Sequence, residues 1–276
     1  MGQWWIAAAV VGVLPPCVGA AQAPARPATP AALAEARQLV LVTADGWDAT
    51  EATLRRYERA TPGTTWRPVG EAVPVTLGRT GMAWGAGEGG GPLEGMPAGA
   101  RSGALVKREG DGRSPAGAFP LLAAFGYGAA DTTVRSRLPF LPVADGTVCV
   151  DDAASPLYNA VVDRAAAGRA RWTSAERMRR VAGYRQGVVV GYNGAWVRGA
   201  SGTVRTPGAR APRAGRGSCI FLHVWDGPDE PTAGCTAMDE AALAEVVAWL
   251  DPRARPALVQ LPAGIVGPLR GVWGLP

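Results

Sequence analysis

Histidine and lysine are nearly absent from this chain of 276 residues. His223 is its only histidine and Lys107 its only lysine, so the other basic residues are arginines distributed along the chain. The formal net charge is +5 and the sequence pI is about 9.4. Such a balance suits an anionic polymer or surface, but it also describes an ordinary solvated basic surface, and it identifies no partner.

The most conspicuous apolar run opens the chain. Residues 1–23, MGQWWIAAAVVGVLPPCVGAAQA, end in AQA, the small-x-small pattern of a signal-peptidase site. We therefore expect a signal peptide over 1–23 and a secreted protein. An uncleaved anchor is the alternative, although the PP dipeptide leaves a short run for a spanning helix. A lipid-attachment box at Cys17 is a further alternative, which the proline before it fits poorly.

Cysteine is sparse as well, with four residues in the whole sequence. Cleavage after Ala23 would remove Cys17 and leave Cys149, Cys219 and Cys235. Three cysteines in an oxidising compartment predict one disulfide and one free thiol.

Repeats and internal linkers are not apparent either. After the Pro/Ala-rich tether at 24–31, APARPATP, the chain therefore predicts a single domain over 32–276. The glycine-rich segment 85–99 is expected to be a mobile surface loop. Its glycines lack the G-x-G-x-x-G spacing between a strand and a helix that a dinucleotide site requires.

Short apolar and β-branched runs bounded by turn residues dominate the domain, and they predict strands. The expected strands are Leu39–Val42, Val73–Leu77, Thr147–Val150, Gly187–Tyr192, Cys219–Trp225 and Leu258–Leu261. Three segments are expected to be helical because they carry cap-like residues or a one-sided apolar pattern: Thr50–Arg59, Thr173–Tyr184 and Thr236–Leu250. Because strands outnumber helices without a regular alternation, the prediction is a β-rich α+β fold.

The segment 217–238, GSCIFLHVWDGPDEPTAGCTAM, contains the only histidine and two cysteines. If 219–225 is a strand, Cys219 and His223 share a face but lie about 13 Å apart along it. One zinc ion cannot bridge that distance, because its ligands lie about 2.0–2.3 Å from the metal. A metal site would need a helical segment and oxygen ligands such as Asp226, and we expect none.

Cys235 has a different relation to His223. The turn-rich loop between them can return the thiol to the end of the strand. A helix starting at Thr236 would place Cys235 at a positive helix end that stabilises a thiolate, with the N–H groups of Gly234 and Cys235 as an oxyanion hole. The alternative is a buried histidine with satisfied nitrogens, and a cysteine and histidine without a third member are weak evidence of catalysis.

Longer stretches add a family resemblance. The stretch IFLHVW…PTAGCTAM resembles the active-site signature of L,D-transpeptidase (YkuD-type) catalytic domains. Residues 105–121, LVKREGDGRSPAGAFPL, and residues 149–163, CVDDAASPLYNAVVD, are similar to further segments of a secreted branch of that family. Together the likeness covers most of residues 38–262.

The resemblance implies a YkuD-like mixed β-sandwich with a few flanking helices, located in the periplasm or cell wall. Cys235 would be the nucleophile and His223 the base, with a backbone carbonyl near Val224 or the side chain of Asp226 orienting the imidazole. The substrates implied are peptidoglycan stem peptides; no cofactor, no metal and no nucleic acid are implied, and we expect a monomer. The chain lacks the family's second histidine before Gly-Cys and its following arginine, which leaves substrate-carboxylate binding open.

Other roles follow from these assignments. Cys149 and Cys219 are expected to form the disulfide that leaves Cys235 free. Trp225 is the preferred substrate-binding residue, while Tyr158-Asn159 and Tyr192-Asn193 could line a groove or simply form turns. An L,D-carboxypeptidase with the same site, a non-catalytic wall-binding module and a cysteine hydrolase of another peptide class are the competing functions.

Overall fold

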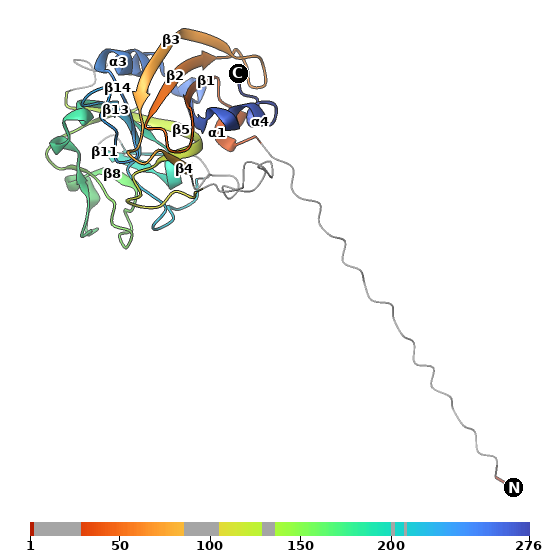
Figure 1. The fold of residues 1–276 in the computed structure, drawn as a ribbon. Coiled ribbons are helices and arrows are strands. Elements are labelled where there is room, and N and C mark those ends of the chain that lie inside the picture. Colours follow the sequence, from red (N-terminus) through yellow and green to blue (C-terminus); the bar gives the residue numbers. More distant parts are fainter. Residues whose placement is uncertain (3–28, 86–104, 129–135, 200–201, 207–208) are drawn as a thin grey trace.

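The computed structural model describes residues 1–2, 29–85, 105–128, 136–199, 202–206 and 209–276 (Figure 1). Nearly all of the expected signal peptide, most of the tether and most of the glycine-rich segment 85–99 lie outside these residues. The described part from residue 31 onward forms two β-sheets with a small number of helices around them.

The larger sheet contains the N-terminal strands and both strands of the 217–238 region. In spatial order its strands are β10 (Gln186–Val190), β13 (Phe221–Val224), β14 (Thr236–Met238), β3 (Arg67–Thr76), β2 (Glu51–Glu58), β1 (Gln38–Ala44), β15 (Ala257–Pro262), β5 (Ser114–Gly126) and β4 (Met82–Trp84), with β6 (Phe140–Pro142) beside β5. The long strand β5 pairs with β15 through residues 117–120 and with β10 through residues 121–126. The sheet therefore closes on itself.

The smaller sheet follows the order β12 (Gly202–Arg205), β11 (Trp196–Gly199), β8 (Ala160–Asp163), β7 (Thr147–Cys149) and β9 (Glu176–Arg177). The α-helices are α1 (Ala31–Ala34), α3 (Glu240–Trp249) and α4 (Ala263–Trp273), and the 3₁₀ turns are η1 (Arg164–Ala167), η2 (Met178–Arg180), η3 (Ala182–Arg185), η4 (Tyr192–Gly194) and η5 (Pro252–Ala254). Two sheets and a few flanking helices make this the β-rich α+β fold expected from the sequence.

Two apolar clusters hold these layers together. The larger one joins the main sheet to α3 and α4, with Leu243, Val246 and Val247 of α3 fully buried, as their spacing on one helix face predicts. The second cluster fills the space between the two sheets and includes Phe125, Tyr184, Phe221, Cys149 and Cys235. The expected nucleophile therefore lies at the junction of the sheets.

The six expected strands are present, but the helix predictions were only partly right. Residues Thr50–Arg59 contain β2 instead of a helix, since Leu54 and Arg56 alternate inward between β1 and β3. Residues Thr173–Tyr184 contain β9, η2 and part of η3. None of the helices in the described ranges is long and apolar enough to cross a membrane.

The third helix begins later than expected. Thr236–Met238 is strand β14, and α3 starts at Glu240 with the Asp239 carboxylate accepting hydrogen bonds from the N–H groups of Ala241 and Ala242. An aspartate is a good N-cap because its side chain satisfies backbone donors at the first turn. The cap-like pattern was therefore real, but it belongs to Asp239 and not to Thr236.

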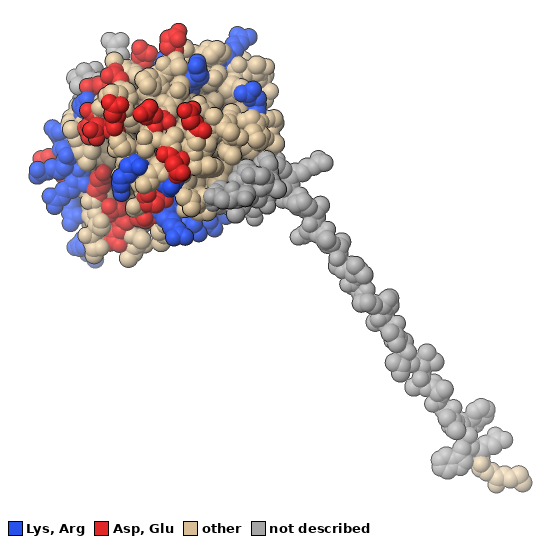
Figure 2. Space-filling view, viewed as in Figure 1, with Lys and Arg blue, Asp and Glu red and all other residues tan. Residues whose placement is uncertain are grey.

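Charged side chains of both signs are interspersed over the face shown in Figure 2, with a group of basic side chains at one edge. That edge corresponds to the green segment of Figure 1 beside the smaller sheet. The segment contributes the exposed arginines 164, 169, 171, 177, 179 and 180. Part of the basic charge is thus concentrated next to the smaller sheet.

Candidate active site

The parallel pairing of β13 and β14 brings His223 and Cys235 to the same side of the main sheet. His223 is opposite Ala237, and Leu222 is opposite Thr236, so Cys235 is level with Phe221. Alternate residues of a strand point to the same face, which places Cys235 and Ala237 with Phe221 and His223. A strand spacing of about 4.8 Å and a rise of about 3.3 Å per residue put the Cα atoms of His223 and Cys235 roughly 8 Å apart.

The turn before Cys235 is anchored to β5. The Cys235 carbonyl accepts hydrogen bonds from the hydroxyl groups of Ser114 (3.0 Å) and Thr232 (2.7 Å). Gly234 has a φ of 145°, and a Cβ atom there would lie 2.9 Å from the carbonyl oxygen of Arg113. Glycine is needed at this position both for its backbone conformation and for the close approach of β5.

Two expectations for this turn were wrong. No helix begins beside the thiol, because β14 follows Cys235 directly and α3 starts only at Glu240. The Gly234 N–H donates to the Thr232 hydroxyl oxygen at 3.0 Å, so in this structure it is not free to bind an oxyanion. The role of the Cys235 N–H in an oxyanion hole stays a prediction.

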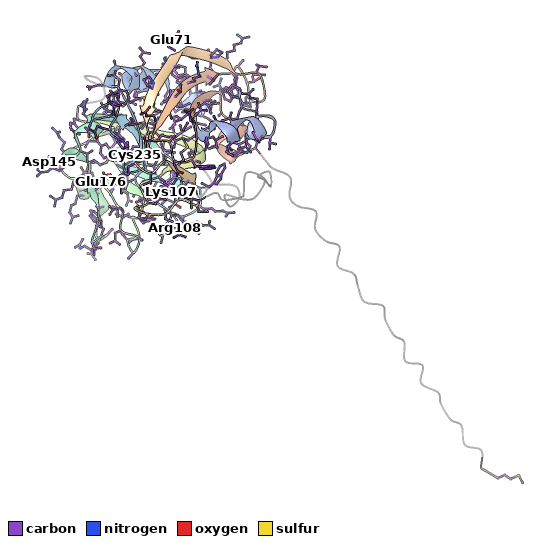
Figure 3. All side chains as sticks on the ribbon, in the orientation of Figure 1. Glu71, Lys107, Arg108, Asp145, Glu176 and Cys235 are labelled. Carbon is purple, nitrogen blue, oxygen red and sulfur yellow. A yellow bond between two sulfur atoms is a disulfide. The ribbon has the colours of Figure 1, made fainter. Side chains whose placement is uncertain are left out.

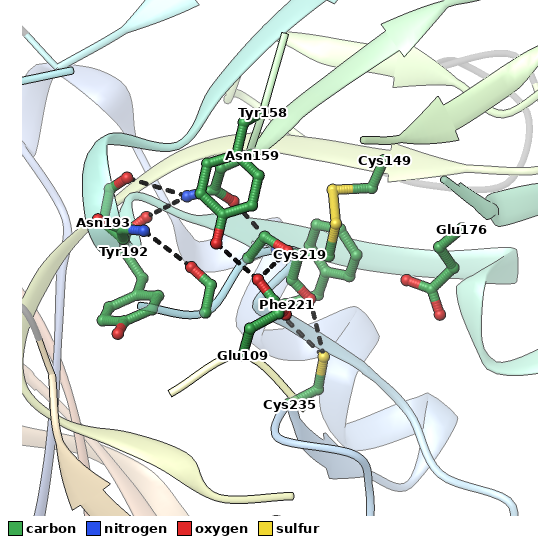
Figure 4. The surroundings of a disulfide bond; sticks show 12 residues. Glu109, Cys149, Tyr158, Asn159, Glu176, Tyr192, Asn193, Cys219, Phe221 and Cys235 are labelled. Atoms are coloured by element: carbon green, nitrogen blue, oxygen red, sulfur yellow. Dashed lines mark hydrogen bonds between the residues drawn. A yellow bond between two sulfur atoms is a disulfide. The ribbon is translucent and has the colours of Figure 1, made fainter. Parts of the chain in front are cut away.

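The Cys235 thiol is buried and protonated. The Phe221 N–H donates to the sulfur at 3.3 Å, and the thiol is 3.4 Å from the carbonyl oxygen of Cys219 (Figure 4). Burial raises the pKa of the Cys235 thiol to about 12; the charge of Glu176 acts in the same direction, and Phe221, Tyr184 and Lys107 oppose it. This thiol therefore needs a base before it can attack.

The main chain holds the imidazole of His223 in one tautomer. Its Nδ1 atom lies 2.8 Å from the carbonyl oxygen of Val224. Since a carbonyl can only accept, Nδ1 carries the proton and the lone pair is on Nε2. Burial lowers the pKa of His223, against the raising effects of the Val224 carbonyl and of Asp226, so the ring is neutral at neutral pH. The Val224 carbonyl is the orienting group expected from the sequence, and Asp226 acts only through its charge.

Packing fixes the plane of this ring. A Cβ atom on Gly183 would lie 2.9 Å from Nδ1 of His223, so the η3 backbone is in close contact with one side. The Tyr184 ring meets the imidazole edge-on, with 5.2 Å between the ring centroids. The sulfur of Cys235 is hydrogen-bonded to main chain in this geometry.

A disulfide connects the smaller sheet to the segment just before β13, where Cys219 has a left-handed backbone (φ 57°) and therefore does not share a strand face with His223, as had been expected. Cys149 and Cys219 are bonded, with their Cα atoms 5.9 Å apart, and Cys235 is the free thiol among the described residues (Figure 4). This is the pairing expected from the sequence. With Cys219 bridged, its thiolate is not available to a metal, and the described residues contain no group of three His, Cys, Asp or Glu side chains suited to holding one.

Two buried asparagines hold the segment before β13. Asn159 and Asn193 both have left-handed backbones, with φ values of 60° and 49°. The Asn159 amide donates to the carbonyls of Tyr192 and Asn193 and accepts from the Cys219 N–H, while Asn193 is bonded to the main chain of Arg213 and of residue 217. Of the two alternatives for these aromatic-Asn pairs, the structure supports turn residues.

Two residues next to the thiol were missed in the sequence. Glu176 of β9 is opposite Cys149 in β7, and its carboxylate accepts a hydrogen bond from the Tyr184 hydroxyl at 3.0 Å. Burial, together with the charge of Asp151, raises the pKa of Glu176 to about 7, against the opposing hydrogen bond from Tyr184. Both residues lie within 173–184, which was expected to be a helix, and that interpretation hid their inward positions.

Lys107 also influences the thiol, because its charge lowers the pKa of Cys235. Lys107 is buried, and its Nζ atom is 2.6 Å from Asp111 and 2.9 Å from the carbonyl oxygen of Arg108. Figure 3 labels Lys107, Glu176 and Cys235 in the same central part of the molecule. Trp225 directly follows β13 and is partly exposed, and its main-chain N–H donates to the Met238 carbonyl. Its contact with substrate stays a prediction.

A cavity of about 690 Å³ lies away from this site. It is lined by residues of β5 and by two further segments, one around Arg205 and one around Arg255. Neither His223 nor Cys235 lines it. Since the cavity contains no nucleophile paired with a base, we assign the candidate chemistry to Cys235.

Comparisons with known proteins give no further information about this site. Neither a family model, nor a curated protein, nor a solved structure matches the chain.

Proposed function

We propose that this protein is a secreted peptidoglycan L,D-transpeptidase that works by cysteine acyl transfer. The observation that carries the proposal is the pair on β13 and β14: a free thiol, Cys235, on the same face as a neutral imidazole whose Nδ1 is held by the Val224 carbonyl. That fixed tautomer leaves Nε2 as the base.

The segments behind the family resemblance also meet at this thiol, although they are distant in sequence. Ser114, from the segment 105–121, bonds the Cys235 carbonyl. Cys149, from the segment 149–163, is bonded to Cys219, whose carbonyl contacts the Cys235 sulfur. A shared location in space is what a common catalytic role would require.

The reaction follows from the groups present. Nε2 of His223 takes the proton from the Cys235 sulfur, and the thiolate attacks the carbonyl of the third residue in a tetrapeptide stem. The C–N bond breaks, the imidazolium returns its proton to the leaving D-alanine amine, and a thioester remains. An acceptor amine then loses a proton to His223 and displaces the thiol, which gives the cross-link; water in its place gives an L,D-carboxypeptidase. Thiol, imidazole and backbone N–H groups suffice for these steps.

A carbapenem provides the direct test, because it is an acylating substrate analogue with no acceptor requirement. We expect intact-mass spectrometry to show one covalent adduct on the wild type and none on Cys235→Ala. Tetrapeptide stems should release D-alanine with the wild type only. Glu71→Gln is the control for a harmless substitution, because Glu71 is exposed and lies far from Cys235 (Figure 3).

The competing functions predict other results. A wall-binding module would form no adduct and release no D-alanine, but it would still bind peptidoglycan sacculi. A cysteine hydrolase of another peptide class would form a Cys235 adduct with a broad thiol reagent yet leave tetrapeptide stems intact. Either result would overturn the transpeptidase proposal.

A further inference from the structure

The Tyr184 hydroxyl lies between a half-buried carboxyl group and the expected nucleophile. It donates to Glu176 Oε2 at 3.0 Å, and it is close enough to the Cys235 sulfur to lower the pKa of that thiol. The tyrosine ring packs edge-on against both Phe221 and His223, with 5.2 Å between ring centroids in each pair. Tyr184 is thus fixed by the same residues that form the site.

The charges around Glu176 come from three elements. Asp151, which follows β7, and Tyr184 of η3 face the carboxyl, and Cys235 lies beyond Tyr184. Arg177, its neighbour on β9, is exposed. The charge of Lys107 lowers the pKa of Cys235. The described groups facing Glu176 are therefore acidic or neutral, and an ionised Glu176 adds a negative charge that raises the pKa of Cys235.

A tyrosine hydroxyl has a single hydrogen to donate. When Glu176 is ionised, that hydrogen goes to the carboxylate, because charge-assisted hydrogen bonds are the stronger ones. When Glu176 is protonated, its own O–H can donate to the Tyr184 oxygen, and the tyrosine hydrogen is then free to point at sulfur. The proton on Glu176 therefore decides which way the Tyr184 hydroxyl points.

We infer that Glu176 and Tyr184 are positioning residues for the Cys235 thiol: a protonated Glu176 turns the Tyr184 hydroxyl toward the sulfur and stabilises the thiolate, and an ionised Glu176 withdraws that stabilisation. The inference rests on the proposed function only in taking this thiolate as the attacking group. The pKa of Glu176, raised to about 7 by burial, places the change of state near neutral pH.

Alkylation of Cys235 by iodoacetamide tests this without any substrate. The rate constant is measured from pH 5.5 to 9.5 at the Cys235 peptide by mass spectrometry, since Cys149 and Cys219 are bonded to each other. For the wild type, we expect the logarithm of the rate constant to rise less steeply with pH near pH 7, because ionisation of Glu176 opposes ionisation of the thiol. The side chain at position 176 stays neutral in Glu176→Gln, so the alkylation rate constant of this variant should rise by one decade per pH unit. It should equal the wild-type rate constant at pH 5.5 and exceed it about tenfold at pH 8.5.

The Tyr184→Phe variant tests whether Glu176 acts on the Cys235 alkylation rate through the Tyr184 hydroxyl. If the hydroxyl carries it, Glu176→Gln should change the alkylation rate much less in the Tyr184→Phe background than in the wild type. Glu71→Gln removes one charge far from the site and should keep the wild-type profile. Circular dichroism and thermal melting confirm that each variant is folded.

The outcomes are decisive in both directions. Parallel profiles for the wild type and Glu176→Gln would overturn the inference, and an undiminished Glu176→Gln effect without the Tyr184 hydroxyl would overturn the role of Tyr184. If the carbapenem forms no adduct while the alkylation profiles differ as expected, the transpeptidase proposal fails and the positioning of Cys235 by Glu176 stands.

Discussion

The two sheets contribute different things to the candidate site. The main sheet supplies His223 and Cys235 from neighbouring strands, where the hydrogen-bonded ladder fixes their separation. The smaller sheet supplies Cys149, which is bridged to Cys219, and Glu176, whose charge raises the pKa of the thiol. Loss of His223 or Cys235 should therefore remove the proposed reaction at every pH, whereas changes in the smaller sheet should alter stability and pH dependence.

The largest effect is expected for His223→Gln, which removes the base and keeps a side chain of similar length. Without a base, a thiol whose pKa is about 12 is rarely ionised at neutral pH, so carbapenem acylation should fall by about 10²–10⁴-fold. Stopped-flow acylation kinetics measure this fall, and unchanged circular dichroism confirms the fold. An unchanged acylation rate would remove His223 from the base role.

Removing the disulfide should affect stability more than chemistry. The Cys149→Ala/Cys219→Ala variant opens a link across a sequence separation of 70 residues, which the loop-entropy relation converts to roughly 4 kcal/mol of unfolding free energy. Urea denaturation measures this loss. Well below the unfolding transition, acylation should fall far less than in His223→Gln; an equal fall would mean that the smaller sheet is needed for the chemical step itself.

Glu176→Gln should change how stability depends on pH. The folded pKa of Glu176 is raised to about 7 from an ordinary value of 4.5, so between these values the folded state holds a proton that the unfolded state has lost. The free energy of unfolding therefore declines as pH rises through this window, by on the order of 3 kcal/mol for this group. Urea denaturation at pH 4, 6 and 8 should show this decline in the wild type and a flatter curve in Glu176→Gln. Parallel curves would contradict the buried, protonated carboxyl.

The smallest effect is expected for Ser114→Ala. This change removes the hydrogen bonds to the Gly78 N–H and the Cys235 carbonyl, but the carbonyl keeps its bond from Thr232. We expect a loss of about 1–2 kcal/mol in unfolding free energy and a few-fold loss of acylation rate. Urea denaturation and carbapenem kinetics measure both, and an acylation loss as large as that of His223→Gln would make Ser114 a member of the catalytic group.

The strand pattern of the fold was readable from the sequence because buried strands are short, apolar and bounded by turns. Leu39–Val42 and Leu258–Leu261 are examples, and they pair in parallel as β1 and β15. The segment Thr50–Arg59 misled because its residues favour helices, while its position between two strands determines its structure. Such pairing involves partners distant in sequence, and local propensity contains no information about them.

The candidate site was predictable in part for a similar reason. His223, Cys235 and the disulfide follow from cysteine count, strand spacing and family resemblance. Glu176 and Tyr184 could not be found this way, because their contacts arise only when the smaller sheet packs on the main sheet. The helix expected to begin at Thr236 begins only at Glu240. Residues Thr236–Met238 form strand β14 instead, which brings Cys235 level with Phe221.

Burial of Cys235 also has a redox consequence. Thiol–disulfide exchange proceeds through a thiolate, and the Cys235 sulfur rests 3.4 Å from the carbonyl oxygen of Cys219, a residue whose own sulfur is bridged. A permanently ionised Cys235 would be poised to attack that bridge and reshuffle it. Because the pKa of Cys235 is raised to about 12, the thiol stays protonated at neutral pH, and it can coexist with the neighbouring disulfide.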